Sequence, residues 1–143
     1  MGLLSPQDEA VLKEHLSAIT KPVTLLLFTQ AFGGSESGTV AKTILNEIAA
    51  LNDQITVVEK SFVLDTEDKA KYGVDKTPAI VILSDGDDTR MRMYGAPVGY
   101  EFVGLVEAIV VAGTGKIDLD PETLKWIHAV DKPTHIQVFS TPT

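Results

Sequence analysis

One stretch restricts the possible folds more than any other. Residues 79–83 (Ala-Ile-Val-Ile-Leu) are continuously apolar and follow a Thr77-Pro78 step. So short a run, rich in β-branched side chains and bounded by turn-forming residues, predicts a buried strand rather than a helix. Pro78 then lies at the first strand position, where a sheet does not need the missing N–H group. Residues 84–88 contain an Asp-Gly pair, and Gly86 suits the positive φ of a tight hairpin. We therefore expect an antiparallel strand to follow over residues 89–95.

Composition restricts the class of protein. A chain of 143 residues suits one domain, or one domain with an appendage. Its 20 acidic and 12 basic residues give a net charge of −8, so we expect neither a nucleic-acid nor a membrane partner. No apolar run approaches the roughly 20 residues of a membrane span, and the amino terminus lacks a signal pattern, which favours a cytoplasmic location. The absence of cysteine excludes thiol chemistry, and we expect no metal site and no cofactor.

The remaining pattern predicts alternating helices and strands. Ser5-Pro6 opens a helix to about Ile19 with an apolar stripe that includes Val11, and Lys21-Pro22 ends it. Strand, helix and strand in succession imply a parallel crossover. The expected elements are strands at 23–28 and 55–62, helices at 39–51 and 100–111, a short helix opened by a capping box at 65–68, a helix from Asp120-Pro121 to about Val130, and a strand at 135–139.

The glycine-rich loop at residues 30–38 is the first candidate for chemistry. A phosphate-binding loop needs lysine after the last glycine, but Thr39 stands there and Glu36 would repel the anion. A nucleophile elbow needs serine where Glu36 stands, and the glycine spacing differs from the dinucleotide fingerprint. We interpret the segment as a flexible loop in which Ser37 or a neighbour caps the next helix. A serine nucleophile, Ser35 or Ser37, is the enzymatic alternative, but none of the three histidines is placed beside it.

The order of elements resembles a thioredoxin fold with an extra leading helix. The Thr77-Pro78 step is similar to the cis-proline of that fold, and residues 92–102 are similar to a signature at the end of the first unit of tandem thioredoxin-fold proteins. Residues 20–23, 47–51 and 128–131 also resemble that set. The resemblance is to glutaredoxin-like protein disulfide oxidoreductases and to the N-terminal domain of the alkyl hydroperoxide reductase flavoprotein subunit. It implies an α/β fold with a mixed four-stranded sheet flanked by helices and a C-terminal helix-strand appendage.

The resemblance also implies what this chain lacks. A catalytic unit would carry two cysteines in the region of residues 32–38, where serine and glycine stand, and a serine hydroxyl does not ionise near neutral pH. We therefore expect no catalytic residue and no thiol-disulfide activity from this chain alone. The expected role is a redox-inactive scaffold that docks a second thioredoxin-like unit or a redox partner protein of a disulfide-oxidoreductase or peroxide-reduction system. The expected docking face comprises Phe32, Gly33, Gly34, Ser35, Thr77 and Pro78.

Two further expectations follow. Residues 1–115 form the thioredoxin-like domain, and residues 116–143 form a linker helix and the first strand of a second unit that is cut short. The alternative function is a free-standing module that binds glutathione or a peptide, because the edge beside the proline offers backbone groups to an extended ligand.

Overall fold

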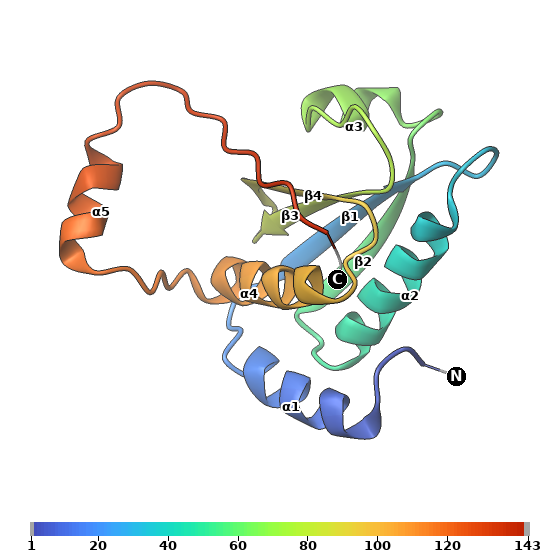
Figure 1. Cartoon of the computed structure of the whole chain (residues 1–143), viewed down its shortest axis with the longest axis horizontal. Coiled ribbons are helices and arrows are strands. Elements are labelled where there is room, and N and C mark those ends of the chain that lie inside the picture. Colours follow the sequence, from blue (N-terminus) through green and yellow to red (C-terminus); the bar gives the residue numbers. More distant parts are fainter. Residues whose placement is uncertain (1, 142–143) are drawn as a thin grey trace.

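The computed structural model describes residues 2–141, which form a four-stranded mixed sheet flanked by helices (Figure 1). β1 pairs in parallel with β2 and antiparallel with β3, and β3 pairs antiparallel with β4, in the order β2-β1-β3-β4. This arrangement confirms the expected α/β architecture with its leading helix. The elements are α1 (Pro6–Leu16), β1 (Val23–Thr29), α2 (Glu36–Ala50), β2 (Ile55–Ser61), α3 (Thr66–Lys71), β3 (Ala79–Ser84), β4 (Asp87–Tyr94), α4 (Tyr100–Thr114) and α5 (Pro121–His128).

The helix ends follow local hydrogen bonding. Ser5 and Asp8 form a capping box at the start of α1. The helix ends at Leu16, earlier than expected, because the Ser17 hydroxyl and N–H both turn back to the carbonyl of Glu14. The predicted apolar stripe was wrong at Val11, which is 53% exposed. The capping box expected at the start of α3 was also wrong, since the Asp65 carboxylate accepts the N–H of Ser61 instead.

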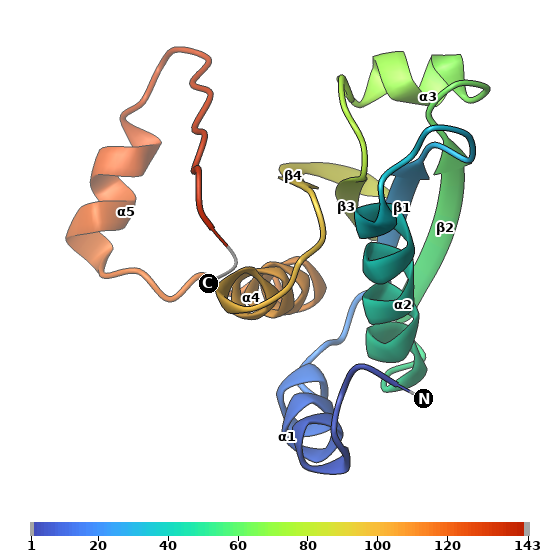
Figure 2. The same ribbon diagram turned by 45° about the vertical axis from the view of Figure 1, so that its right-hand side comes forward.

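Apolar packing covers both faces of the sheet. The larger cluster joins α1, α2 and α4 to one face, and α1 lies below α2 and α4 in both views (Figures 1 and 2). The smaller cluster, on the opposite face, includes Leu26, Phe28, Val81 and Val74. Burial of neighbouring β1 residues on opposite faces confirms the prediction that this strand is covered on both sides.

α4 is fixed to the segment between α1 and β1. The carbonyl of Gly113 accepts the N–H groups of both Thr20 and Lys21 at 3.0 Å. Gly113 is itself buried, and a Cβ built on it would lie 2.6 Å from Cγ2 of Ile19. The end of α4 therefore closes the domain against the start of β1.

The hairpin of β3 and β4 forms as the sequence predicts, with one irregularity. Asp85 and Gly86 adopt positive φ in the turn. The register then shifts between Val81 and Leu83, and Arg90 adopts a φ of 65° on the edge strand. A β-bulge of this kind has no clear signal in the sequence, because Arg90 is not a residue that favours positive φ.

The C-terminal segment lies apart from the sheet, as Figure 2 shows. α5 ends at His128 rather than near Val130. The strand expected at residues 135–139 was wrong: the segment pairs with no strand, and residues 129–141 are exposed throughout. A 2.7 Å hydrogen bond from the Ser140 hydroxyl to the Glu101 carboxylate links this segment to α4. Residues 142 and 143 of the expected appendage lie outside the described residues, and no described helix is long and apolar enough to cross a membrane.

Candidate functional site

A shallow depression lies where β1 ends and β3 begins. Its volume is about 10 Å³, room for about one water molecule. Four of the six residues expected on the docking face line it, while Gly33 does not and Phe32 projects away with 90% of its surface exposed. Three further residues line it: Gln30 and Gly38 belong to the candidate loop at residues 30–38 but were not expected on the face, and Thr29, at the end of β1, was missed. The lining residues are Thr29, Gln30, Gly34, Ser35, Gly38, Thr77 and Pro78.

The loop beside the depression is shorter than expected. α2 begins at Glu36 rather than Thr39, because Ser35 already has the extended backbone of an N-cap residue, with φ −78° and ψ 158°. Ser37 therefore lies inside the helix and does not cap it, and the Ser35 side chain makes no capping hydrogen bond. Gly34 closes the turn: a Cβ there would overlap the carbonyl oxygen of Gln30. Glycine at this position is a requirement of the backbone path.

The opposite wall of the depression is the proline step. The Thr77-Pro78 peptide bond is cis, as the resemblance implies. Pro78 is buried and Thr77 is half-buried. The Pro78 carbonyl accepts the N–H of Gly95 at 2.9 Å, which joins the step to the end of β4. The wall is therefore fixed by backbone bonding at the start of β3.

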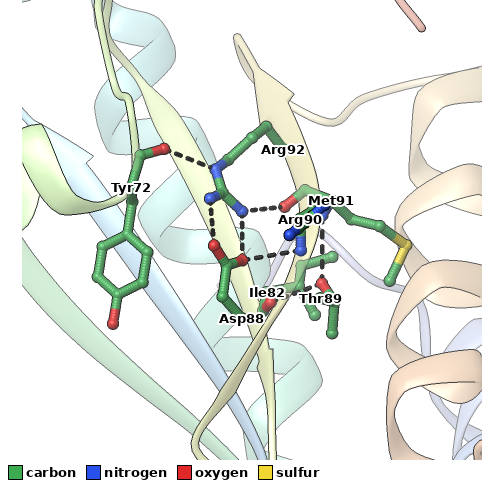
Figure 3. A network of polar contacts seen from close by, with 7 residues as sticks. All are labelled: Tyr72, Ile82, Asp88, Thr89, Arg90, Met91 and Arg92. Atoms are coloured by element: carbon green, nitrogen blue, oxygen red, sulfur yellow. Dashed lines mark hydrogen bonds and ion pairs between the residues drawn. The ribbon is translucent and has the colours of Figure 1, made fainter. Parts of the chain in front are cut away.

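A polar network fixes the segment that leads to this step (Figure 3). The Arg92 guanidinium donates to both carboxylate oxygens of Asp88, at 2.8 and 2.7 Å, and its Nε donates to the carbonyl of Tyr72 at 3.0 Å. Asp88 also accepts the N–H of Arg90 at 2.8 Å, inside the bulge. Hydrogen bonding to Arg92 lowers the pKa of Asp88 below its usual value of 3.8. The network ties the end of α3, from which the chain runs on to Thr77, to the edge strand.

Sequence comparison finds similarity to alkyl hydroperoxide reductase proteins. No family model matches the chain. The alkyl hydroperoxide reductase protein AhpF of Escherichia coli K12 is 31% identical over 111 residues, which are 78% of this chain and 19% of that protein. AhpF of Staphylococcus epidermidis is 27% identical over 113 residues, which are 78% of this chain and 20% of that protein. The chain thus spans about a fifth of the length of these relatives.

Solved structures extend the comparison. The NTD_N/C domain of alkyl hydroperoxide reductase AhpF from Enterococcus faecalis superposes with a TM-score of 0.81 at 28% identity, covering 90% of this chain and 62% of that one. The chain has a thioredoxin-like fold. A protein disulfide oxidoreductase from Aeropyrum pernix shares the fold, with a TM-score of 0.75 at 19% identity over 87% of this chain and 54% of that one.

In this thioredoxin-like unit, the depression is lined only by threonine, serine, glutamine, glycine and proline. The residues that line it include no cysteine, histidine or carboxylate. Among the described residues, no group of three or more histidine, cysteine or acidic side chains could hold a metal ion. His15 lies on α1, His128 on α5 and His135 in the C-terminal segment, so none lines the depression with Ser35. The serine-nucleophile alternative therefore lacks a base at the site.

Proposed function

We propose that this chain is a redox-inactive thioredoxin-like unit that docks a catalytic partner in a thiol-disulfide or peroxide-reduction system. The observation that carries the proposal is a thioredoxin-like site that keeps its tight loop at Gly34 and its cis-proline at Pro78 but has no thiol. Disulfide exchange requires a thiolate, and the hydroxyl of Ser35 does not supply an equivalent nucleophile near neutral pH. The surface then acts by contact alone.

The form of the site favours a polypeptide over a small molecule. Sites that bury a small ligand usually have volumes of about 300–1,000 Å³. The depression here holds about 10 Å³, so glutathione would lie on it rather than in it. An extended chain needs no cavity, because it is held by backbone hydrogen bonds along its length. The flat face between Ser35 and Thr77 suits that mode.

A second thioredoxin-like unit is the partner that we propose. The segment after α4 exposes large apolar side chains and adds no strand to the sheet, which supports a further domain packed against it. The relatives are longer than this chain, and the solved Enterococcus faecalis chain extends beyond the part that superposes. The proposal therefore treats residues 2–115 as the folded unit and residues 116–141 as the connection. We also propose that the chain is located in the cytoplasm. The exposed apolar residues are Ile117, Leu119, Trp126, Ile127, Val130, Ile136, Val138 and Phe139.

An NMR titration tests the docking role. The ¹⁵N-labelled chain is titrated with a thioredoxin that carries Cys-x-x-Cys, as a stand-in for the catalytic unit. We expect saturable shifts in the amides of residues 33–35, 77 and 79. The matched variants are Gly34→Ala, which forces the loop away from Gln30, and Gly104→Ala on α4, whose added methyl group meets nothing within 4 Å.

The first variant should weaken binding and the second should leave it unchanged. If the partner saturates without shifting these amides, the proposed face is wrong. A thermal-shift titration with reduced glutathione distinguishes the scaffold from the alternative function, a free-standing glutathione-binding module. A rise in melting temperature with glutathione would favour the binding module over the scaffold.

A further inference from the structure

Three exposed apolar side chains lie at the tips of two neighbouring connections. Phe32 is 90% exposed on the β1–α2 connection, and Val63 and Leu64 are 58% and 81% exposed on the β2–α3 connection. The two connections lie side by side in both views (Figures 1 and 2). A backbone hydrogen bond of 2.9 Å from the N–H of Phe62 to the carbonyl of Thr29 joins their bases. We call these three side chains the apolar tips.

The turn that carries Val63 and Leu64 is closed by its own hydrogen bonds. The N–H of Leu64 donates to the Ser61 hydroxyl at 3.2 Å, and the N–H of Asp65 donates to the Ser61 carbonyl at 2.9 Å. The Asp65 carboxylate accepts the N–H of Ser61 in return. The turn therefore fixes the backbone that presents two large apolar side chains to solvent. A partner that contacts them has little backbone conformational entropy to remove.

Acidic side chains lie near the apolar tips. An open hollow of about 270 Å³ lies beside Leu64 and is lined by it and by residues 65–68, three of which are acidic. One of these carboxylates, that of Asp68, forms an ion pair with Lys60 at 2.8 Å. Within residues 2–141, Glu67 and Glu36 have no ion-pair partner, and Glu36 is the first residue of the helix that follows Phe32. Two lysines lie in the same region, Lys60 and Lys69, whose Nζ is 4.4 Å from the centroid of the Phe62 ring. Acidic residues near the tips, four in number, thus outnumber them: Glu36, Asp65, Glu67 and Asp68.

We propose that the apolar tips form a docking surface for a basic segment of a partner protein. Apolar side chains of that segment contact Phe32, Val63 and Leu64, and a lysine or arginine enters the acidic hollow. Charge complementarity selects this occupant, because an acidic segment would place like charges together. A second copy of this chain, with its net charge of −8, is disfavoured for the same reason. The inference goes beyond the proposed function, because Phe32 projects away from the depression between Ser35 and Thr77.

Two synthetic peptides test the charge requirement on the whole chain. In the first, lysine alternates with leucine and serine; in the second, glutamate replaces each lysine. Binding is followed by the amide shifts of the ¹⁵N-labelled chain and by calorimetry at low and high salt. We expect the lysine peptide to shift the amides of residues 63–68 and the glutamate peptide to leave them in place. High salt should weaken the binding.

Variants distinguish binding at the apolar tips from nonspecific hydrophobic binding elsewhere on the surface. Leu64→Ser should weaken binding of the lysine peptide by about tenfold or more, as loss of an interface anchor does. Tyr100→Ser is the matched control, since Tyr100 is 80% exposed but lies on α4. Glu67→Gln should weaken binding and reduce its salt dependence. Glu107→Gln, at an exposed position of α4, should do neither.

The outcomes distinguish this inference from the proposed function. Equal binding of both peptides, or no binding of either, would overturn the inference. Shifts at residues 33–35, 77 and 79 with none at 63–68 would also overturn it while leaving the proposed docking face intact. Shifts at 63–68 alone would support the apolar tips and count against the face at Thr77 and Pro78.

Discussion

Gly113 provides the sharpest test of how the domain is packed. It lies in the last turn of α4, and a Cβ built there would approach Cγ2, Cγ1 and Cβ of Ile19 at 2.6, 2.8 and 3.1 Å. Ile19 is only 6% exposed, so its side chain has little room to move away. Gly104 lies in the same helix, and a Cβ there would meet nothing within 4 Å. The two glycines allow the same substitution to be compared with and without a steric conflict.

The expected effects have opposite signs. Overpacking costs about 1–3 kcal/mol. Alanine is favoured over glycine in a helix by up to about 1 kcal/mol. Gly113→Ala should therefore lower the free energy of unfolding by about 1–2 kcal/mol, and Gly104→Ala should raise it by about 0.5–1 kcal/mol. Unfolding of 143 residues has an entropy of about 0.3 kcal/mol/K. The melting temperatures of the two variants should accordingly differ by about 5–10 °C.

Urea unfolding followed by far-UV circular dichroism measures both effects. Fluorescence is less suitable, because Trp126 is 72% exposed on α5 and reports little on the core. A third measurement places Gly113→Ala in an Ile19→Ala background, which removes the atoms in conflict. In the Ile19→Ala background, Gly113→Ala should leave the free energy of unfolding unchanged or raise it. The steric explanation would be refuted if Gly113→Ala lowered the free energy of unfolding equally in the parent and in the Ile19→Ala background, or if alanine had the same effect at Gly104 and Gly113.

Three further predictions concern the site and its supports. Arg92→Ala should lower the free energy of unfolding by about 1–3 kcal/mol, because the Tyr72 carbonyl loses its Nε donor and the Asp88 carboxylate keeps only the N–H of Arg90. Urea unfolding of Arg92→Lys beside it measures how much of this loss depends on the planar guanidinium. Because the pKa of Asp88 is lowered in the folded chain, the ionised carboxylate stabilises the fold fully above the unfolded pKa near 3.8, and this stabilisation is lost as pH falls through the folded pKa. Measuring the free energy of unfolding against pH in acid should show this loss in the parent and a smaller loss in Arg92→Ala. The double variant Ser35→Cys and Gly38→Cys should form an intramolecular disulfide on oxidation, since the N–H of residue 38 already donates to the carbonyl of residue 35; mass spectrometry showing only intermolecular dimers would contradict this.

Sequence reasoning found the elements whose signals are local. The apolar run of β3 and the Asp-Gly turn were enough for the hairpin, and Ser5-Pro6 was enough for the start of α1. Four of the six expected face residues line one depression because the end of β1 and the start of β3 meet at one end of the sheet. That meeting follows from the order of the strands, and the order came from the resemblance.

The errors arose where a residue had two possible hydrogen-bond partners. Asp65 could cap α3 or return to Ser61, and it returns to Ser61. Ser35 and Ser37 were both possible caps, and the backbone of Ser35 decided the helix start. The bulge at Arg90 depends on contacts that only the folded hairpin brings together. The strand expected at residues 135–139 failed for a different reason: alternation marks a segment able to pair, but a partner strand is needed for a strand to exist.

The double hydrogen bond to the Gly113 carbonyl has a consequence for the nascent chain. Thr20 and Gly113 are 93 residues apart, so at about 5–20 residues per second the ribosome needs about 5–20 s to supply this acceptor. During that interval the segment between α1 and β1 cannot close, and the core face of α1, with Leu12 and Leu16, lacks its α4 contacts. Chaperones that recognise apolar segments would meet this helix first, well before the site at the other end of the sheet has formed.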